Sequence, residues 1–239
     1  KWYWIFRNII FGPFLRVYNR PEIVGVDNIP STGPAIIASN HQSVMDSFFL
    51  PLLCPRQITF LAKAEYFNGT TPVGRLQKWF FTNVGQRPVN RTSASAGQDA
   101  LNTAVEVLND GDLFGIYPEG TRSPDGRLYK GKTGVARIAL ASGAQVIPVA
   151  MIGTRDVNPI GTWFPRPGKV RVKVGDPIYP IEFVNNRGLE RDSYEAIRAL
   201  TDHIMRQLQQ LSGQEYADVY AAEVKKALAE GGDSSPHNP

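Results

Sequence analysis

Apolar runs alternate with segments of helical spacing along most of this 239-residue chain. Short apolar runs are typical of buried strands, whereas apolar residues three or four positions apart indicate helices. The pattern predicts strands at residues 35–39, 58–62, 113–117, 146–152 and 170–174. It predicts helices at residues 43–53, 73–81, 94–108, 134–142, 193–211 and 215–229. Strands separated by helices favour an α/β domain with a mixed, largely parallel sheet flanked by helices, and such sheets bind ligands beyond the carboxyl ends of their strands.

The start of the chain is rich in aromatic and basic side chains, among them Trp2, Trp4, Arg7 and Arg16. Aromatic rings beside arginine are typical of a helix that lies in the head-group layer of a membrane. The apolar runs here are too short to span a bilayer, which requires about 20 residues. We therefore expect an amphipathic, membrane-associating helix; the alternative is a helix packed on the domain's own core.

The chain is expected to divide into three parts. Residues 1–20 form the interfacial aromatic and basic helix, and residues 21–229 form the α/β domain with its C-terminal helices. Residues 230–239, which are rich in Gly, Ser and Pro, form a disordered tail.

Charge and cysteine content narrow the classes of function. The single cysteine, Cys54, allows no disulfide within the chain and fits a reducing compartment. The net charge of +4 is unevenly distributed, since residues 56–91 carry six basic side chains against Glu65 alone. Such a patch attracts lipid head groups, phosphorylated metabolites or nucleic acid. No nucleic-acid-binding motif accompanies it, and the scattered histidines and lone cysteine predict no metal site.

The segment from Asn40 to Asp46 follows the first predicted strand and contains the histidine best placed for acid–base chemistry, His41. In a regular helix two residues five positions apart lie roughly 140° apart around the axis. His41 and Asp46 can therefore meet only if His41 stays in the turn before the helix, where Asp46 could orient the ring as a base. The alternative is that Ser43 and Asp46 form a helix-capping box and His41 is a hydrogen-bonded turn residue.

A second candidate segment, residues 117–123, follows the third predicted strand and reads Tyr-Pro-Glu-Gly-Thr-Arg-Ser. Gly120 allows close approach of a ligand, Arg122 presents a fork suited to phosphate or carboxylate, and Glu119 can accept hydrogen bonds from a polyol hydroxyl. The alternative is an ordinary Glu–Arg pair on a surface turn.

Two further basic clusters occur at residues 85–91 and 130–134. The first contains Arg87 and Arg91, and the second places Lys132 just before a predicted helix, where backbone N–H groups can bind an anion. The second lacks the spacing of a nucleotide-binding P-loop.

The four blocks in this order resemble those of the glycerophospholipid acyltransferase family, which acylates 1-acylglycerol-3-phosphate. Residues 40–46 are similar to its Asn-His-x-Ser-x-x-Asp block, residues 85–91 to its Gly-x-x-x-x-x-Arg block and residues 117–123 to its Phe-Pro-Glu-Gly-Thr-Arg-Ser block. Residues 146–149 resemble its apolar-Pro block, and the likeness spans residues 23–174. Tyr117 stands where the family has Phe, and Arg87-Pro88 and Asn90 depart from its second block.

The resemblance implies a role for each matching residue. His41 would be the general base and Asp46 its orienting partner. The residues that would bind the acceptor are Arg91, Glu119, Gly120, Thr121 and Arg122, with Lys63 and Lys132 at further basic positions. No cofactor or metal is implied; the co-substrate would be acyl-CoA or an acylated carrier protein. The partners would be acyl-CoA, lysophosphatidic acid and a membrane surface, at the cytoplasmic face of the inner membrane.

Three other functions stay open from the sequence. One is an acyltransferase acting on a different lysophospholipid or a glycolipid. Another is a non-catalytic lipid-binding protein that uses the same basic pocket. The third is a thioester hydrolase with Ser39 or Ser43 as nucleophile, although neither lies in a Gly-x-Ser-x-Gly motif.

Overall fold

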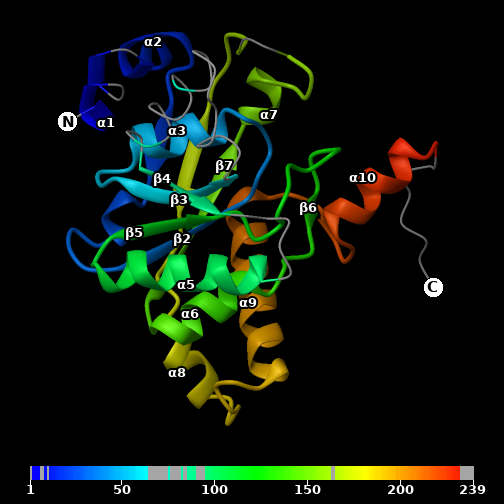
Figure 1. Cartoon of the computed structure of the whole chain (residues 1–239). Helices are drawn as coiled ribbons and strands as arrows, with labels where there is room; N and C mark the ends of the chain where they lie inside the picture. Colours follow the sequence, from blue (N-terminus) through cyan, green and yellow to red (C-terminus); the bar gives the residue numbers. More distant parts are fainter. Residues whose placement is uncertain are drawn as a thin grey trace.

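The computed structural model describes residues 2–5, 8–9, 11–63, 75, 82, 85–89, 95–162 and 165–231. Its centre is a seven-stranded sheet of order β1-β8-β7-β2-β5-β3-β4 (Figure 1). The strands are β1 (Glu22–Val24), β2 (Ala35–Ser39), β3 (Ile58–Lys63), β4 (Gln86–Val89), β5 (Leu113–Ile116), β7 (Gln145–Ile152) and β8 (Arg171–Val174). Every neighbouring pair is parallel except β7 and β8. The predicted fold class, a mixed and largely parallel sheet flanked by helices, is confirmed.

Helices cover both faces of the sheet (Figure 1). One face carries α2 (Phe11–Tyr18), α3 (Asp46–Leu53) and the short α7 (Thr154–Val157). The other carries α5 (Ala96–Asn109), α6 (Gly134–Ser142), α8 (Pro180–Asn185) and α9 (Tyr194–Ser212). The remaining described elements are α1 (Trp2–Ile5), the 3₁₀ turn η2 (Val26–Asn28), β6 (Leu128–Tyr129), β9 (Tyr216–Ala217) and α10 (Ala221–Ala229).

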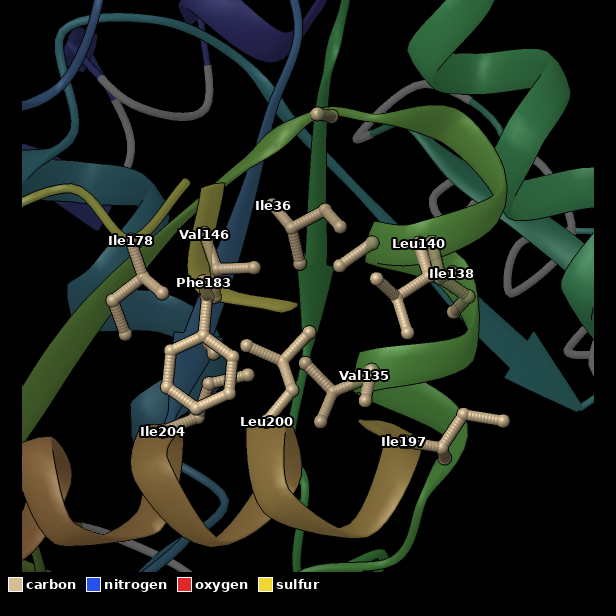
Figure 2. Packing of buried hydrophobic residues seen from close by; sticks show 14 of the residues in the cluster. Ile36, Val135, Ile138, Leu140, Val146, Ile178, Phe183, Ile197, Leu200 and Ile204 are labelled. Carbon is tan, nitrogen blue, oxygen red and sulfur yellow. The ribbon is translucent and has the colours of Figure 1, made fainter. Parts of the chain in front are cut away.

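The central strand β2 contributes to two hydrophobic cores because successive side chains of a strand point to opposite faces. Ile36 and Ala38 join the core beneath α6 and α9, whereas Ala35 and Ile37 join the core beneath α3. Figure 2 shows Ile36 facing side chains from α6 and from α9, such as Val135 and Leu200. This burial on both faces explains why the strand is apolar at consecutive positions rather than alternating.

Several element predictions differ from the structure. The helix predicted at 43–53 begins only at Asp46, and in the turn before it the backbone N–H groups of Gln42 and Ser43 donate to the Asp46 carboxylate. The segment predicted as one helix at 215–229 contains β9, which pairs with β6, followed by α10. The helix predicted at 73–81 lies outside the described residues, apart from Arg75. Within the described part of the chain, no helix is long and apolar enough to cross a bilayer.

Candidate active site

Two loops meet at the carboxyl edge of the sheet because the strands that lead into them are parallel neighbours. Ala38 of β2 lies beside Ile116 of β5, so the chain leaving each strand enters the same space. A backbone hydrogen bond joins the loops: the Ser123 N–H donates to the His41 carbonyl oxygen at 2.8 Å. The two segments singled out in the sequence therefore form one site.

His41 and Asp46 are in direct contact: the imidazole Nδ1 lies 2.9 Å from Asp46 Oδ2. His41 sits in the turn before α3, and Asp46 is the first residue of that helix, as the helical geometry required. The same carboxylate oxygen accepts the N–H groups of Gln42 at 2.6 Å and Ser43 at 2.8 Å. Asp46 therefore binds the imidazole and the two backbone N–H groups of the preceding turn, whereas the helix cap is Met45 and has no side-chain hydrogen bond, so the predicted capping box of Ser43 and Asp46 is not formed.

Burial differs sharply between the two members of this pair. The Asp46 side chain is fully buried, whereas 17% of the His41 side chain is exposed. Because Nδ1 faces the carboxylate, the other ring nitrogen, Nε2, is the one left for a substrate. The arrangement is that of a base oriented by a carboxylate.

A stack of aromatic rings supports the imidazole. The Tyr117 ring lies 4.0 Å from the His41 ring, centroid to centroid, at an interplanar angle of 13°. Phe60 of β3 stacks on Tyr117 in turn, at 5.6 Å. The Tyr117 hydroxyl lies 3.3 Å from Ser47 Oγ, and burial raises the pKa of the phenol, so it stays protonated.

Glu119 is fully buried and binds backbone on both sides. Its Oε1 accepts the His41 N–H and its Oε2 accepts the Tyr129 N–H, each at 3.0 Å. Burial raises the pKa of this carboxyl to about 7, against the lowering effect of the two N–H donors. Glu119 therefore fastens the two loops together; a contact with a glycerol hydroxyl remains a prediction from the resemblance.

Cationic side chains lie around the next three residues of this turn. Gly120 has φ 74°, in the left-handed region that favours glycine, and a methyl group there would lie 3.4 Å from Lys132 Nζ. Thr121 accepts a hydrogen bond from Lys225 Nζ at 2.7 Å. Lys225 is a residue that the sequence analysis missed, since it stands on α10, far along the chain.

Two other predicted binding residues are less fully described. Arg91 lies outside the described residues. Lys63 is the last residue of β3, at the carboxyl edge of the sheet, and only its backbone is described. Their roles remain predictions.

A cleft of about 1140 Å³ opens beside His41 and runs between the sheet and the helices α5 and α6. Besides His41, its lining includes Thr121, the cationic side chains Arg122, Lys132, Arg137 and Arg191, and the carboxylate Asp192. Much of the remaining lining is apolar and includes Phe60, Leu61, Ala62, Ala100, Leu101, Phe114, Ile116, Val135, Ile138 and Leu140. A cleft of this chemistry fits an amphiphile with an anionic head and a hydrocarbon chain.

The two candidate serine nucleophiles are buried and engaged elsewhere. Ser39 Oγ donates to the carbonyl oxygen of Asn40 at 3.1 Å. Ser43 Oγ donates to the carbonyl oxygen of Asn158 at 3.0 Å. Both side chains are at most 1% exposed, so neither hydroxyl is presented to a substrate.

The fold and the site together define an α/β protein in which an imidazole–carboxylate pair lies at a cleft lined by cationic and apolar side chains. The Acyltransferase family model matches residues 20–152 of the chain. The chain therefore belongs to the acyltransferase family.

Similar proteins bear related names. The chloroplastic 1-acyl-sn-glycerol-3-phosphate acyltransferase LPAT1 of Arabidopsis thaliana is 32% identical over 177 residues, which cover 73% of this chain and 47% of the relative. A Bacillus subtilis protein named 1-acyl-sn-glycerol-3-phosphate acyltransferase is 27% identical over 201 residues, covering 82% of this chain and 87% of that protein. The crystal structure of the 1-acyl-sn-glycerophosphate acyltransferase PlsC from Thermotoga maritima superposes with a TM-score of 0.61 at 26% identity, covering 87% and 82% of the two chains. The chain spans about half the length of its chloroplastic relatives.

Proposed function

We propose that this protein transfers an acyl chain from acyl-CoA to the free hydroxyl of 1-acylglycerol-3-phosphate, giving phosphatidic acid. The observation that carries the proposal is the contact between His41 and Asp46 at a cleft lined by cationic and apolar side chains. The printed names of the relatives support the choice of acceptor.

The geometry suits direct transfer without an acyl-enzyme. His41 Nε2 takes the proton of the acceptor hydroxyl as that oxygen attacks the thioester carbonyl carbon. The new C–O bond forms, the C–S bond breaks, and the thiolate leaves with the proton returned by the imidazolium. Asp46 holds Nδ1–H throughout and stabilises the positive charge that develops on the ring.

In this proposal the positive charges that line the cleft favour an acceptor with an anionic head group. Arg122 and Lys132 lie on the cleft wall near His41 and attract the phosphate of lysophosphatidic acid. Arg91 is proposed as a further phosphate ligand from the resemblance alone. The apolar interior of the cleft receives the hydrocarbon chain of a substrate.

The N-terminal helices suit a location on a membrane surface. On α2, Leu15 is buried against the domain, while Phe14 and Val17 are 55% and 78% exposed. Trp4 of α1 is 61% exposed as well, and Arg16 and Arg20 lie close by in the sequence. Apolar side chains beside arginine favour insertion into an anionic head-group layer, so we propose peripheral attachment at the cytoplasmic face of the inner membrane.

The catalytic proposal is tested by comparing His41→Ala with a histidine control. Each variant is incubated with radiolabelled acyl-CoA, or acylated carrier protein, and a panel of lysolipids, and the products are separated by thin-layer chromatography. We expect His41→Ala to lose phosphatidic acid formation. His203→Ala should retain it, because His203 lies on α9 and packs on Phe183.

The alternatives give distinct outcomes in the same assay. Free fatty acid without acylated acceptor would indicate a thioesterase. Binding of lysophosphatidic acid with no turnover would indicate a lipid-binding protein. Unchanged transfer by His41→Ala would overturn the role of the base.

Membrane attachment is tested by flotation with vesicles. The unchanged chain should float with vesicles that contain phosphatidylglycerol. The double variant with Phe14→Asp and Val17→Asp should not bind these vesicles and should remain in the bottom fraction. Retention of the double variant at ordinary salt would show that another surface makes the attachment.

A further inference from the structure

The C-terminal segment packs against the loop that follows the Glu-Gly-Thr-Arg turn. Strand β6 in that loop pairs in parallel with β9, and the Leu128 N–H donates to the Glu215 carbonyl oxygen at 2.8 Å. Next to them, the Asn40 side-chain amide donates to Gln214 Oε1 at 2.7 Å. Two segments of the site therefore contact a part of the chain beyond residues 20–152, the region matched by the family model.

Helix α10 follows this contact in the chain and begins beside β6 (Figure 1). Ala221, at the start of α10, is buried with Tyr129 and Ala217 and fixes that end of the helix. Lys225 lies one turn later on the same face, because residues four apart are neighbours on a helix. Its Nζ donates to Thr121 Oγ1 at 2.7 Å.

Positive charges gather around Thr121. Arg122 is the next residue, and the Lys132 side chain lies against Gly120 on the cleft wall. Burial lowers the pKa of Lys225, the charge of Arg122 lowers it further, and Glu119 raises it. Among the residues described, no carboxylate forms an ion pair with Arg122, Lys132 or Lys225.

Like charges held close together are costly unless an anion neutralises them. A phosphomonoester suits this place, because it carries close to two negative charges and three free oxygens. A phosphodiester carries one charge and two free oxygens, so it gains less from an additional ammonium donor. An additional cation at this place therefore favours a lysolipid with a phosphomonoester head group.

We propose that Lys225 is a ligand of the acceptor phosphate and favours a phosphomonoester head group over phosphodiester lysolipids. The proposal rests on the proposed function and adds to it a residue supplied by the C-terminal helix. Lys225 Nζ donates to Thr121, and because an ammonium group has three donors, it can donate a second hydrogen bond to a phosphate oxygen.

The test compares Lys225→Ala with Lys225→Arg and Lys226→Ala. Lys226 is the matched control because it is the next residue of the same helix and its side chain is 77% exposed. Initial rates are measured against lysophosphatidic acid, lysophosphatidylglycerol and monoacylglycerol, each at saturating acyl-CoA. Melting temperatures of all variants are recorded alongside.

We expect Lys225→Ala to raise KM for lysophosphatidic acid about tenfold or more, the effect of losing one hydrogen bond to a charged group. The ratio of kcat/KM for lysophosphatidic acid to kcat/KM for lysophosphatidylglycerol should fall, and KM for acyl-CoA should stay unchanged. Lys225→Arg should restore most of the affinity, and Lys226→Ala should behave like the unchanged chain.

Two results would overturn the assignment while leaving the proposed function intact. In the first, Lys225→Ala lowers kcat equally on the charged and the neutral acceptors and leaves KM for lysophosphatidic acid unchanged. Lys225 would then only position Thr121 and would not bind the phosphate. The other is identical kinetics of Lys225→Ala and Lys226→Ala. Failure of the unchanged chain to acylate lysophosphatidic acid would overturn the proposed function and the role of Lys225 together.

Discussion

The imidazole of His41 lies almost parallel to the phenol ring of Tyr117, with ring centroids 4.0 Å apart and an interplanar angle of 13°. Tyr117 is also one of the few departures of this chain from the family pattern, which has phenylalanine at that position. The stack restricts rotation of the imidazole out of its plane. The contact with Asp46 fixes the direction in which Nδ1 points within that plane. Two neighbours of different chemistry thus set the orientation of one ring.

Replacing Tyr117 should separate the effect of the ring from that of the hydroxyl. Tyr117→Phe keeps the stack and loses only the contact with Ser47, so kcat should change less than about twofold. Tyr117→Leu removes the stack and should lower kcat about two- to tenfold, since aromatic pairs contribute roughly 0.5–1.5 kcal/mol beyond burial. Steady-state kinetics with lysophosphatidic acid check both, with Ser47→Ala as the control for the hydroxyl. Equal losses in Tyr117→Phe and Tyr117→Leu would assign the effect to the hydroxyl.

Replacing Asp46 should abolish turnover with little loss of structure. In Asp46→Asn an oxygen can still accept the N–H groups of Gln42 and Ser43, but no negative charge stabilises the imidazolium. We expect kcat to fall by about 10³–10⁴-fold, as in other carboxylate–imidazole sites. Asp110→Asn is the control, because Asp110 is an exposed residue that follows the last residue of α5. Circular dichroism checks that Asp46→Asn is folded. A folded Asp46→Asn that retains more than a tenth of the normal kcat would contradict the role of the carboxylate.

The sequence predicts the central strands and the contact between His41 and Asp46 well because both follow local rules. Strands β2, β5 and β7 are buried on both faces, so they appear as uninterrupted apolar runs. The contact of His41 with Asp46 depends only on the turn that precedes α3. Each of these signals lies within a few neighbouring residues.

Long-range pairing accounts for what the sequence did not predict. Strands β6 and β9 have two residues each, too few for a period-two pattern, and β4 contains Gln86, Arg87 and Pro88 at the edge of the sheet. The contact between Lys225 and Thr121 follows from the pairing of β6 with β9. No local pattern marks one lysine of an amphipathic helix as different from Lys226, which faces solvent.

Glu119 should make the stability of the protein depend on pH. Its pKa is about 7 in the folded chain and near 4.5 in the unfolded chain, so between these values the folded state holds a proton that the unfolded state has released. The free energy of unfolding therefore falls as pH rises through this window, by about 3 kcal/mol in full. In Glu119→Gln the side chain is neutral at every pH, and this dependence disappears.

Denaturant unfolding at pH 5, 6, 7 and 8 provides the measurement. The difference between Glu119→Gln and the unchanged chain isolates this carboxyl from other titrating groups. The unchanged chain should lose stability relative to the variant as pH rises. A difference that stays constant with pH would mean that the N–H donors of His41 and Tyr129 balance the burial, and a difference that changes in the opposite direction would mean that they outweigh it.

The cleft should discriminate acyl chains through the space beside Gly115. Gly115 of β5 lines the cleft and lies opposite Phe60 of β3, and a methyl group at Gly115 would come within 2.3 Å of the Phe60 ring. The ring would have to move, and since Phe60 also lines the cleft, the room for a hydrocarbon chain would change. We expect Gly115→Ala to cost about 1–3 kcal/mol of stability, as overpacking does. Turnover of palmitoyl-CoA should fall several-fold more than turnover of decanoyl-CoA.

Gly134→Ala is the matched control, because Gly134 also lines the cleft and a methyl group there meets no atom within 4 Å. It adds the same volume on α6 without displacing a neighbour, so its ratio of palmitoyl to decanoyl turnover should stay close to that of the unchanged chain. Both ratios are measured in competition, with the two donors mixed at equal concentration. A lowered melting temperature for Gly115→Ala with an unaltered ratio would show that the acyl chain binds away from Phe60, and the cleft would then lose its part in the mechanism.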